Sequence, residues 1–183
     1  MKKLLPCFSL LLAVAMPFTL VWSEGAVAQD KGGSSKSTKG KIVNLLTRED
    51  GGQKGVSVEV VYLTPEYFKA TGSTSGVEKY GLDKNLAFKV TLDTHSGDVT
   101  AYNMAKIIHL RDGGGLEHPA LSWEDVEKSS HHRSGIVLFS NLDGDGKPVI
   151  GDGVKSIEVV VKEIAGVKER VFRWELPISY PED

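Results

Sequence analysis

All five histidines of this 183-residue chain lie in one window, between positions 95 and 132. The same window contains Met104, the only methionine beyond the first sixteen residues, which is an outside candidate as a metal ligand. Since the sole cysteine is Cys7, imidazole and thioether groups are the soft ligands available to the rest of the chain. This combination suits copper, and imidazoles alone also suit zinc or nickel, so the window predicts a transition-metal site. Its histidines are His95, His109, His118, His131 and His132.

Three of these histidines follow or precede predicted strands. His95 comes directly after the alternating segment 86–93, whereas His131 and His132 precede the segment 135–140. If these two segments are antiparallel neighbours, the three histidines lie at one rim of a sheet. Successive side chains of an extended segment point to opposite faces, so His95 is expected to share Cu or Zn with either His131 or His132. The alternative is that these imidazoles only form hydrogen bonds with loop groups.

An acidic, glycine-rich segment, 141–152, has the oxygen spacing of a calcium loop. Side chains at loop positions 1, 3, 5 and 12 would bind the ion, and a glycine makes the sharp turn at position 6. The four side chains are Asn141, Asp143, Asp145 and Asp152. Asn at position 1, Asp in place of the usual bidentate Glu at position 12, and strands on both flanks depart from the EF-hand pattern, so we expect weak Ca²⁺ binding at most. The alternative is a solvated hairpin loop whose Asp and Asn residues favour turns.

The sequence lacks the motifs of common enzymes and of nucleic-acid-binding proteins. It contains no nucleophile-elbow G-x-S-x-G, no Walker loop and no dinucleotide-binding motif. Its 22 Lys and Arg residues and 24 Asp and Glu residues are mixed along the chain, so they form no basic stripe for nucleic acid. We therefore expect neither enzymatic activity nor nucleic-acid binding.

Residues 1–28 have the three parts of a secretory signal peptide. Two lysines precede an apolar stretch, and Ala26-Val27-Ala28 supplies the small residues of a cleavage site. We expect cleavage after Ala28, export to a periplasm or to the cell exterior, and no membrane span in the mature chain. Cleavage would also remove Cys7 and with it any disulfide or thiolate site. Residues 29–40 contain no large apolar side chain and predict a flexible tether.

From residue 41 onward the chain alternates between short strand patterns and turn residues. Residues 86–93 alternate between apolar and polar side chains, and Phe172 and Trp174 share one face of the segment 170–175. One short helix is predicted over 65–70, because Thr64 is a good N-cap and proline follows it. The predicted strands are 42–46, 56–60, 86–93, 106–111, 120–123, 135–140, 157–162 and 170–175.

This order of short strands predicts an all-β fold in a single domain over residues 41–176. The expected architecture is an antiparallel two-sheet β-sandwich of immunoglobulin-like type with one short helical insert. A small β-barrel is the alternative. Residues 177–183 are expected to form a loose C-terminal tail.

Two short segments and a tryptophan form a recognisable pattern. Thr94-His95-Ser96, Trp123, and His131-His132-Arg133-Ser134-Gly135 are similar to the order T-H-S, W, H-H-R-x-G in small secreted bacterial β-domains. The resemblance covers about residues 86–175. It implies a shared β-sandwich fold and a shared rim, and it carries no assigned activity or ligand.

These observations predict an exported, monomeric, non-enzymatic binding module. In its sharpest form, the module binds Cu or Zn through histidines at one loop rim. The alternative is a structural or protein-interaction domain that engages a partner in the cell envelope without any metal.

Overall fold

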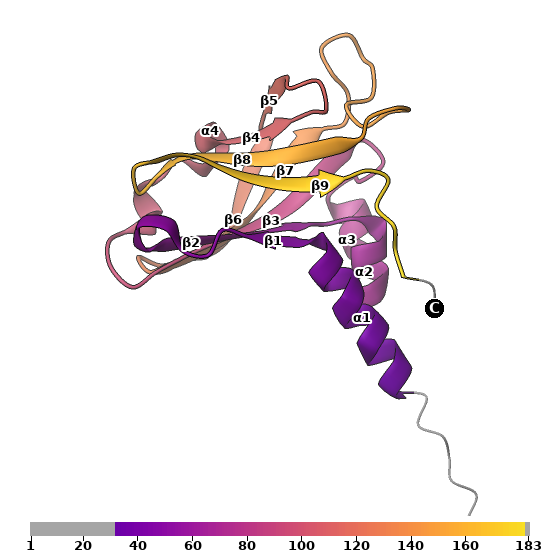
Figure 1. Cartoon of the computed structure of the whole chain (residues 1–183), viewed down its shortest axis with the longest axis horizontal. Coiled ribbons are helices and arrows are strands. Elements are labelled where there is room, and N and C mark those ends of the chain that lie inside the picture. The colour runs from indigo at the N-terminus through magenta and orange to yellow at the C-terminus, as the bar shows by residue number, and fades with distance from the viewer. Residues whose placement is uncertain (1–31, 182–183) are drawn as a thin grey trace, which may run out of the picture. The chain divides into compact units, whose positions relative to one another are not determined.

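The structure, a computed structural model, describes residues 32–181 and contains two antiparallel sheets with a few short helices (Figure 1). The predicted signal peptide lies outside the described residues. No helix within the described part of the chain has the length and apolar character needed to span a membrane.

The strands form two separate sheets, with all neighbours antiparallel. The first sheet contains, in spatial order, β1 (Thr47–Glu49), β2 (Val56–Tyr62), β3 (Asn85–Thr94), β7 (His132–Ser140) and β6 (Ser122–Lys128). The second contains β5 (Glu117–Pro119), β4 (Ile108–Arg111), β8 (Ser156–Ile164) and β9 (Val167–Glu175). The predicted all-β, two-sheet antiparallel sandwich is confirmed, and the strands do not close into a single barrel.

The hydrophobic core includes the alternating apolar side chains that the sequence pattern identified. In β3, Phe88, Val90 and Leu92 are fully buried, whereas Lys89 and Asp93 on the opposite phase are more exposed. Trp174 and Phe172 of β9 are both buried, as their shared phase predicted. Tyr62 stacks on Phe88 with 4.6 Å between ring centroids, and Trp174 packs edge-on against Tyr62 at 6.0 Å. These aromatic contacts fix the orientation of the Tyr62 ring.

The N-terminal segment is a helix, which corrects two predictions. Helix α1 (Gly32–Leu46) replaces most of the predicted tether and the predicted strand over 42–46. Ile42 and Leu46 are four residues apart and therefore share one helix face, which packs on the core. The Leu46 carbonyl accepts a hydrogen bond from the Trp174 indole at 3.1 Å. An apolar run of this length fits both a strand and a helix period, so the pattern alone gave the wrong element.

Helix α2 (Pro65–Thr71) confirms the predicted helical insert and its caps. The Thr64 hydroxyl oxygen accepts a hydrogen bond from the Tyr67 N–H at 3.2 Å, and Gly72 ends the helix with a φ of 74°. A second short helix, α3 (Ser75–Lys79), follows it and was not predicted. The remaining helical turns are η1 (Gln53–Gly55), η2 (Val99–Ala101) and α4 (Met104–Ile107).

The C-terminal segment packs on the domain instead of forming the predicted loose tail. Ile178 and Tyr180 are partly buried against the core, and the Tyr180 hydroxyl donates a hydrogen bond to the Thr64 hydroxyl oxygen at 2.9 Å. Figure 1 shows this segment descending past the end of β9 on the side that carries helices α1 to α3. The segment therefore forms one wall of the hollow described below.

Candidate functional site

The predicted histidine rim exists at the level of the backbone. Strands β3 and β7 are antiparallel neighbours with Asp93 opposite His132, and the Thr94 N–H donates to the His131 carbonyl at 2.9 Å. His95, His131 and His132 therefore lie at the same end of the first sheet, as the strand order predicted. Both His95 and His131 have exposed side chains.

At this rim, the His132 side chain pairs with two carboxylates. His132 Nδ1 contacts the Asp93 carboxylate, and its Nε2 lies 3.2 Å from Glu127 Oε2, so carboxylates face both nitrogens of the ring. The hydrogen bond with Asp93 is the main cause that raises the pKa of His132. Met104 is only 1% exposed and belongs to the core. Among the described residues, no three His, Cys, Asp or Glu side chains are placed to hold a metal ion together. A metal on His95 and His131 or His132 stays a prediction.

The predicted calcium loop is organised by its own backbone. Asn141 Oδ1 accepts a hydrogen bond from the Ile150 N–H at 3.0 Å. Asp143 Oδ1 accepts from the N–H groups of Asp145 at 2.9 Å and of Lys147 at 2.8 Å, which is an Asx-turn arrangement. Asp145 and Asp152 are exposed. Two of the four side chains that would bind calcium, Asn141 and Asp143, thus accept backbone N–H groups, which also suits the hairpin-loop alternative, and Ca²⁺ binding stays a prediction.

The tryptophan and arginine of the recognised pattern have structural roles. The Arg133 guanidinium is buried, donates to both carboxylate oxygens of Asp125 at 2.7 and 3.2 Å, and reaches the Tyr102 carbonyl at 2.7 Å. It lies 5.6 Å from the Trp123 ring. Trp123 also lies over Gly135, where an added Cβ would meet Trp123 Cζ2 at 2.3 Å. The residues of this pattern therefore connect β6 and β7 to the segment between β3 and β4, which links the two sheets.

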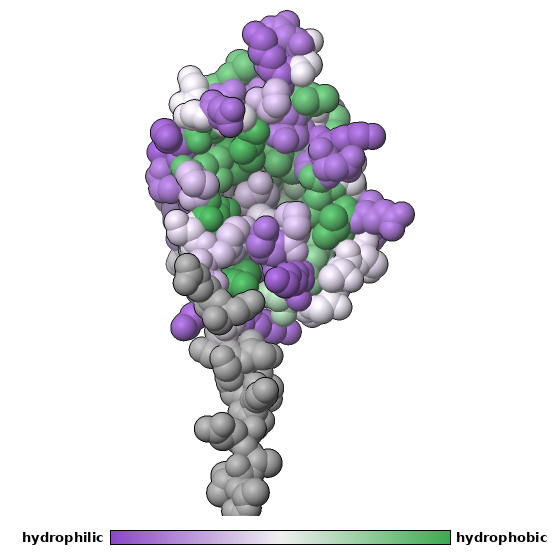
Figure 2. Space-filling view, turned by 90° about the vertical axis from the view of Figure 1, so that its right-hand side faces the viewer, coloured by the Kyte–Doolittle hydropathy of each residue, from purple (hydrophilic) through white to green (hydrophobic). Residues whose placement is uncertain are grey.

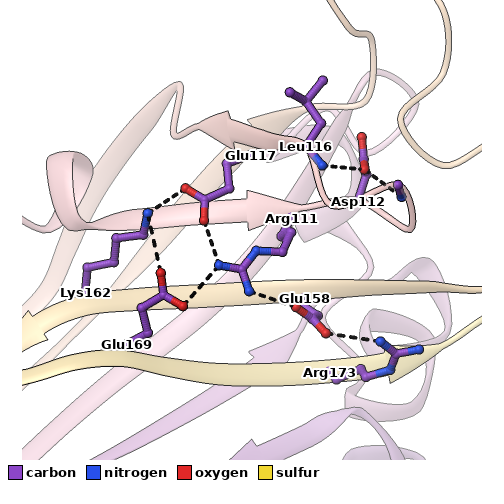
Figure 3. Close-up of polar contacts among 9 residues, drawn as sticks. Arg111, Asp112, Leu116, Glu117, Glu158, Lys162, Glu169 and Arg173 are labelled. Atoms are coloured by element: carbon purple, nitrogen blue, oxygen red, sulfur yellow. Dashed lines mark hydrogen bonds and ion pairs between the residues drawn. The ribbon is translucent and has the colours of Figure 1, made fainter.

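The charged side chains on the outer face of the second sheet form a paired network (Figure 3). Arg111 Nη2 lies 2.7 Å from Glu117 and 3.2 Å from Glu169, and Lys162 Nζ lies 2.6 Å from Glu117. Hydrogen bonds from Lys162 and Arg111 lower the pKa of Glu117 to about 2. Val160, on the same face of β8, is completely buried. Since these charges neutralise one another over an apolar side chain, the network is best explained as part of the sheet.

A hollow of about 510 Å³ lies between the start of α2, the loop before β8 and the C-terminal segment. Its apolar wall residues are Pro65, Ile150, Val154, Leu176, Pro177 and Ile178. Figure 2 shows the side of the molecule that carries these elements: hydrophobic residues gather around a recessed, paler centre, with polar residues at the margin. Small-molecule sites have this volume and this mixture of apolar walls with a few polar groups.

Tyr62 supplies the most informative polar group of the hollow. Its side chain lines the hollow from the end of β2, and the residue is only 9% exposed. Burial is the main cause that raises its pKa, and the nearby Tyr180 and Glu66 raise it further. The hydroxyl has no hydrogen-bond partner within the described residues and is open to the hollow, because the fully buried side-chain atoms without a partner there are His109 Nδ1 and Arg170 Nε. An unpaired, core-anchored hydroxyl is thus presented to the hollow.

Three further polar side chains, those of Thr64, Glu66 and Tyr180, line the hollow together with Tyr62. Tyr180 donates to Thr64, and Thr64 also caps α2, so both hydroxyls are fixed in place. Burial is the largest cause that raises the pKa of Tyr180 to about 12, and the proximity of Glu66 raises it too. Glu66 lines the hollow together with both tyrosines. At the opposite side of the hollow, Asp152 and Lys155 supply one charge of each sign.

Sequence reasoning did not identify this site. Tyr62 lies just beyond the predicted strand 56–60 and was assigned no role, whereas Tyr180 belonged to a segment expected to be loose. The available signal was weak: two aromatic residues next to prolines, at 62–65 and 177–181, which are more than a hundred residues apart. Only the packing of the C-terminal segment on α2 brings them together.

A scan against protein-family models, a search of curated proteins and a search of solved structures each found no significant match to this chain.

Proposed function

We propose that this chain is an exported, non-enzymatic binding module whose ligand occupies the hollow between α2, the loop before β8 and the C-terminal segment. The unpaired hydroxyl of Tyr62 carries the proposal. Because this hydroxyl is open to the hollow and makes no hydrogen bond within the described residues, it can donate to or accept from a ligand without first breaking a bond inside the protein.

The surroundings of Tyr62 support the same function. Phe88 and Trp174 hold its ring from the core side, so the hydroxyl is positioned before any ligand arrives. A preorganised group loses little conformational entropy on binding, which favours recognition. The apolar wall residues Ile150, Val154 and Ile178 would cover the nonpolar part of a ligand.

Two neutral or singly charged aromatic probes test the proposal, namely 2-phenylethanol and phenethylamine. Each is titrated into the full chain, and amide chemical shifts are followed by NMR. We expect saturable shifts at Gly151, Gly153 and Val154 with at least one probe. A chain whose hollow residues respond to neither probe would show that this proposal is wrong.

Two matched variants separate binding in the hollow from binding elsewhere. Val154→Phe places a larger side chain in the hollow and is expected to abolish the shifts. Val171→Phe makes the same change on the outer face of β9, where Val171 is 47% exposed, and is expected to leave them unchanged. Equal binding by both variants would place the probe outside the hollow.

A further inference from the structure

The hollow next to α2 has an uneven distribution of charge. Its lining includes the carboxylates of Glu66 and Asp152 and a single ammonium group, that of Lys155. Glu66 lies in the first turn of α2, two residues after Thr64, whose hydroxyl oxygen accepts from the Tyr180 hydroxyl at 2.9 Å, and its charge raises the pKa of both phenols. The side chains that line the hollow therefore carry a formal net charge of −1, from two carboxylates and one ammonium group, which attracts a cation and repels an anion.

From this distribution we infer that the ligand is a small organic amine, protonated at neutral pH, with an apolar body. This inference depends on the proposed function and adds the ligand class. The ammonium group would lie among Glu66, Tyr62 and Tyr180, donating to the carboxylate and to the phenol oxygens. The apolar body would extend along Ile150, Val154 and Ile178.

The chemistry of the three polar groups fits an ammonium better than a neutral alcohol or a carboxylate. An ammonium has three N–H donors and no acceptor, and the site offers one charged and two phenolic acceptors. Hydrogen bonds between charged partners are about twice as strong as neutral ones. A carboxylate would meet Glu66 directly and would have only Lys155 as a compensating charge.

A series of isosteric probes tests the ligand class on the full chain. Phenethylamine, 2-phenylethanol and 3-phenylpropionate share one aromatic body and differ in the charge of their polar end. By NMR titration we expect phenethylamine to bind at least tenfold more tightly than 2-phenylethanol, and 3-phenylpropionate to bind most weakly. This preference should decrease as salt is added, because the attraction is electrostatic.

Two variants assign the preference to Glu66. Glu66→Gln keeps the size of the side chain and removes its charge, so it is expected to remove the tenfold preference while 2-phenylethanol still binds. Glu78→Gln makes the same change on an exposed residue of α3 and is expected to preserve it. A lysine side chain presents the same ammonium, so Nα-acetyl-lysine amide is tested as well, with weaker binding expected than for phenethylamine.

The outcomes distinguish this inference from the proposed function. If 2-phenylethanol or 3-phenylpropionate binds in the hollow as tightly as phenethylamine, the hollow is a binding site and the amine inference is wrong. If Nα-acetyl-lysine amide binds more tightly than phenethylamine, the ligand is a polypeptide and not a small amine. If the hollow residues respond to none of the probes, both the inference and the proposed function are wrong.

Discussion

Arg170 of β9 and Asp50, just beyond β1, form a buried ion pair that joins the two sheets. Arg170 also donates to the carbonyls of Val56 at 3.0 Å and Gln53 at 2.8 Å, while Asp50 accepts from the N–H groups of Gly52 and Val58. The pair thus fixes the β1–β2 turn against β9 and completes the side of the sandwich opposite β4 and β5.

Removing one member of this pair should strongly destabilise the fold. Arg170→Met would leave the Asp50 carboxylate buried without its partner, and such a change costs about 3–5 kcal/mol. We expect the urea midpoint of unfolding to fall accordingly. Arg173→Met is the matched control on the same strand, since the Arg173 side chain is 51% exposed and its ion pairs are worth about 0–1 kcal/mol. Equal losses in the two variants would contradict the structural role of the buried pair.

Gly135 should tolerate no larger residue while Trp123 is present. An added Cβ would lie 2.3 Å from Trp123 Cζ2 and 2.6 Å from the Glu124 carbonyl oxygen. We expect Gly135→Ala to lower the free energy of unfolding by about 1–3 kcal/mol, the usual cost of overpacking. Gly144→Ala is the control, because a Cβ there meets no atom within 4 Å. Thermal unfolding of both variants tests this prediction, and a Gly135→Ala chain as stable as Gly144→Ala would contradict it.

The strands could be predicted from the sequence because most of them bury one face. In β3, the alternation of Phe88, Val90 and Leu92 with polar residues identified the face that packs on the core. In β9, Phe172 and Trp174 identified that face in the same way. The segment 42–46 was assigned wrongly because its apolar residues fit two periods, and only the contact of Leu46 with Trp174 selects the helix. Tertiary contacts between distant segments produce no such periodic pattern of apolar residues in the sequence.

The functional residues were less accessible to sequence reasoning. The strand order correctly brought His95, His131 and His132 to one rim, but no pattern could indicate that Asp93 and Glu127 would face the ring of His132. Asp143 was identified for its spacing, which suits a calcium loop and an Asx turn equally. Tyr62 and Tyr180 line one hollow only because the C-terminal segment packs on α2. The positions of these two residues in the sequence do not indicate that packing.

The C-terminal segment should contribute measurably to stability. Tyr180→Phe removes the hydrogen bond to Thr64 and keeps the ring, so we expect a loss of about 0.5–1.5 kcal/mol in the free energy of unfolding. Tyr67→Phe is the control, since the Tyr67 hydroxyl has no partner among the described residues. Urea denaturation compares the two. Unchanged stability in Tyr180→Phe would mean that residues 177–181 do not pack in solution as they do here.

The unpaired Tyr62 hydroxyl predicts an unusual response to substitution. Tyr62→Phe removes a hydroxyl that is open to the hollow and makes no hydrogen bond in the described structure, so the free energy of unfolding should stay equal or rise. The same variant should weaken binding of phenethylamine, because the ammonium loses one acceptor. Denaturation and NMR titration on one sample measure both effects. A destabilised Tyr62→Phe chain would show that the hydroxyl already has a partner within the protein.

The His132 ion pairs should make stability depend on pH in a defined direction. Contact with Asp93, and to a lesser extent with Glu127, raises the pKa of His132 above its ordinary 6.5, while Lys89 opposes this. The protonated imidazole therefore stabilises the fold fully below 6.5, and this contribution is lost as the pH rises through the folded-state pKa. The difference in urea midpoint between the unmodified chain and His132→Gln should therefore be larger at about pH 5.5 than at about pH 8.5. In NMR titrations Asp93→Asn should lower the pKa of His132 more than Glu127→Gln does, because the hydrogen bond with Asp93 is the largest cause. A pH-independent difference between the two chains would show that His132 is not held by these carboxylates in solution.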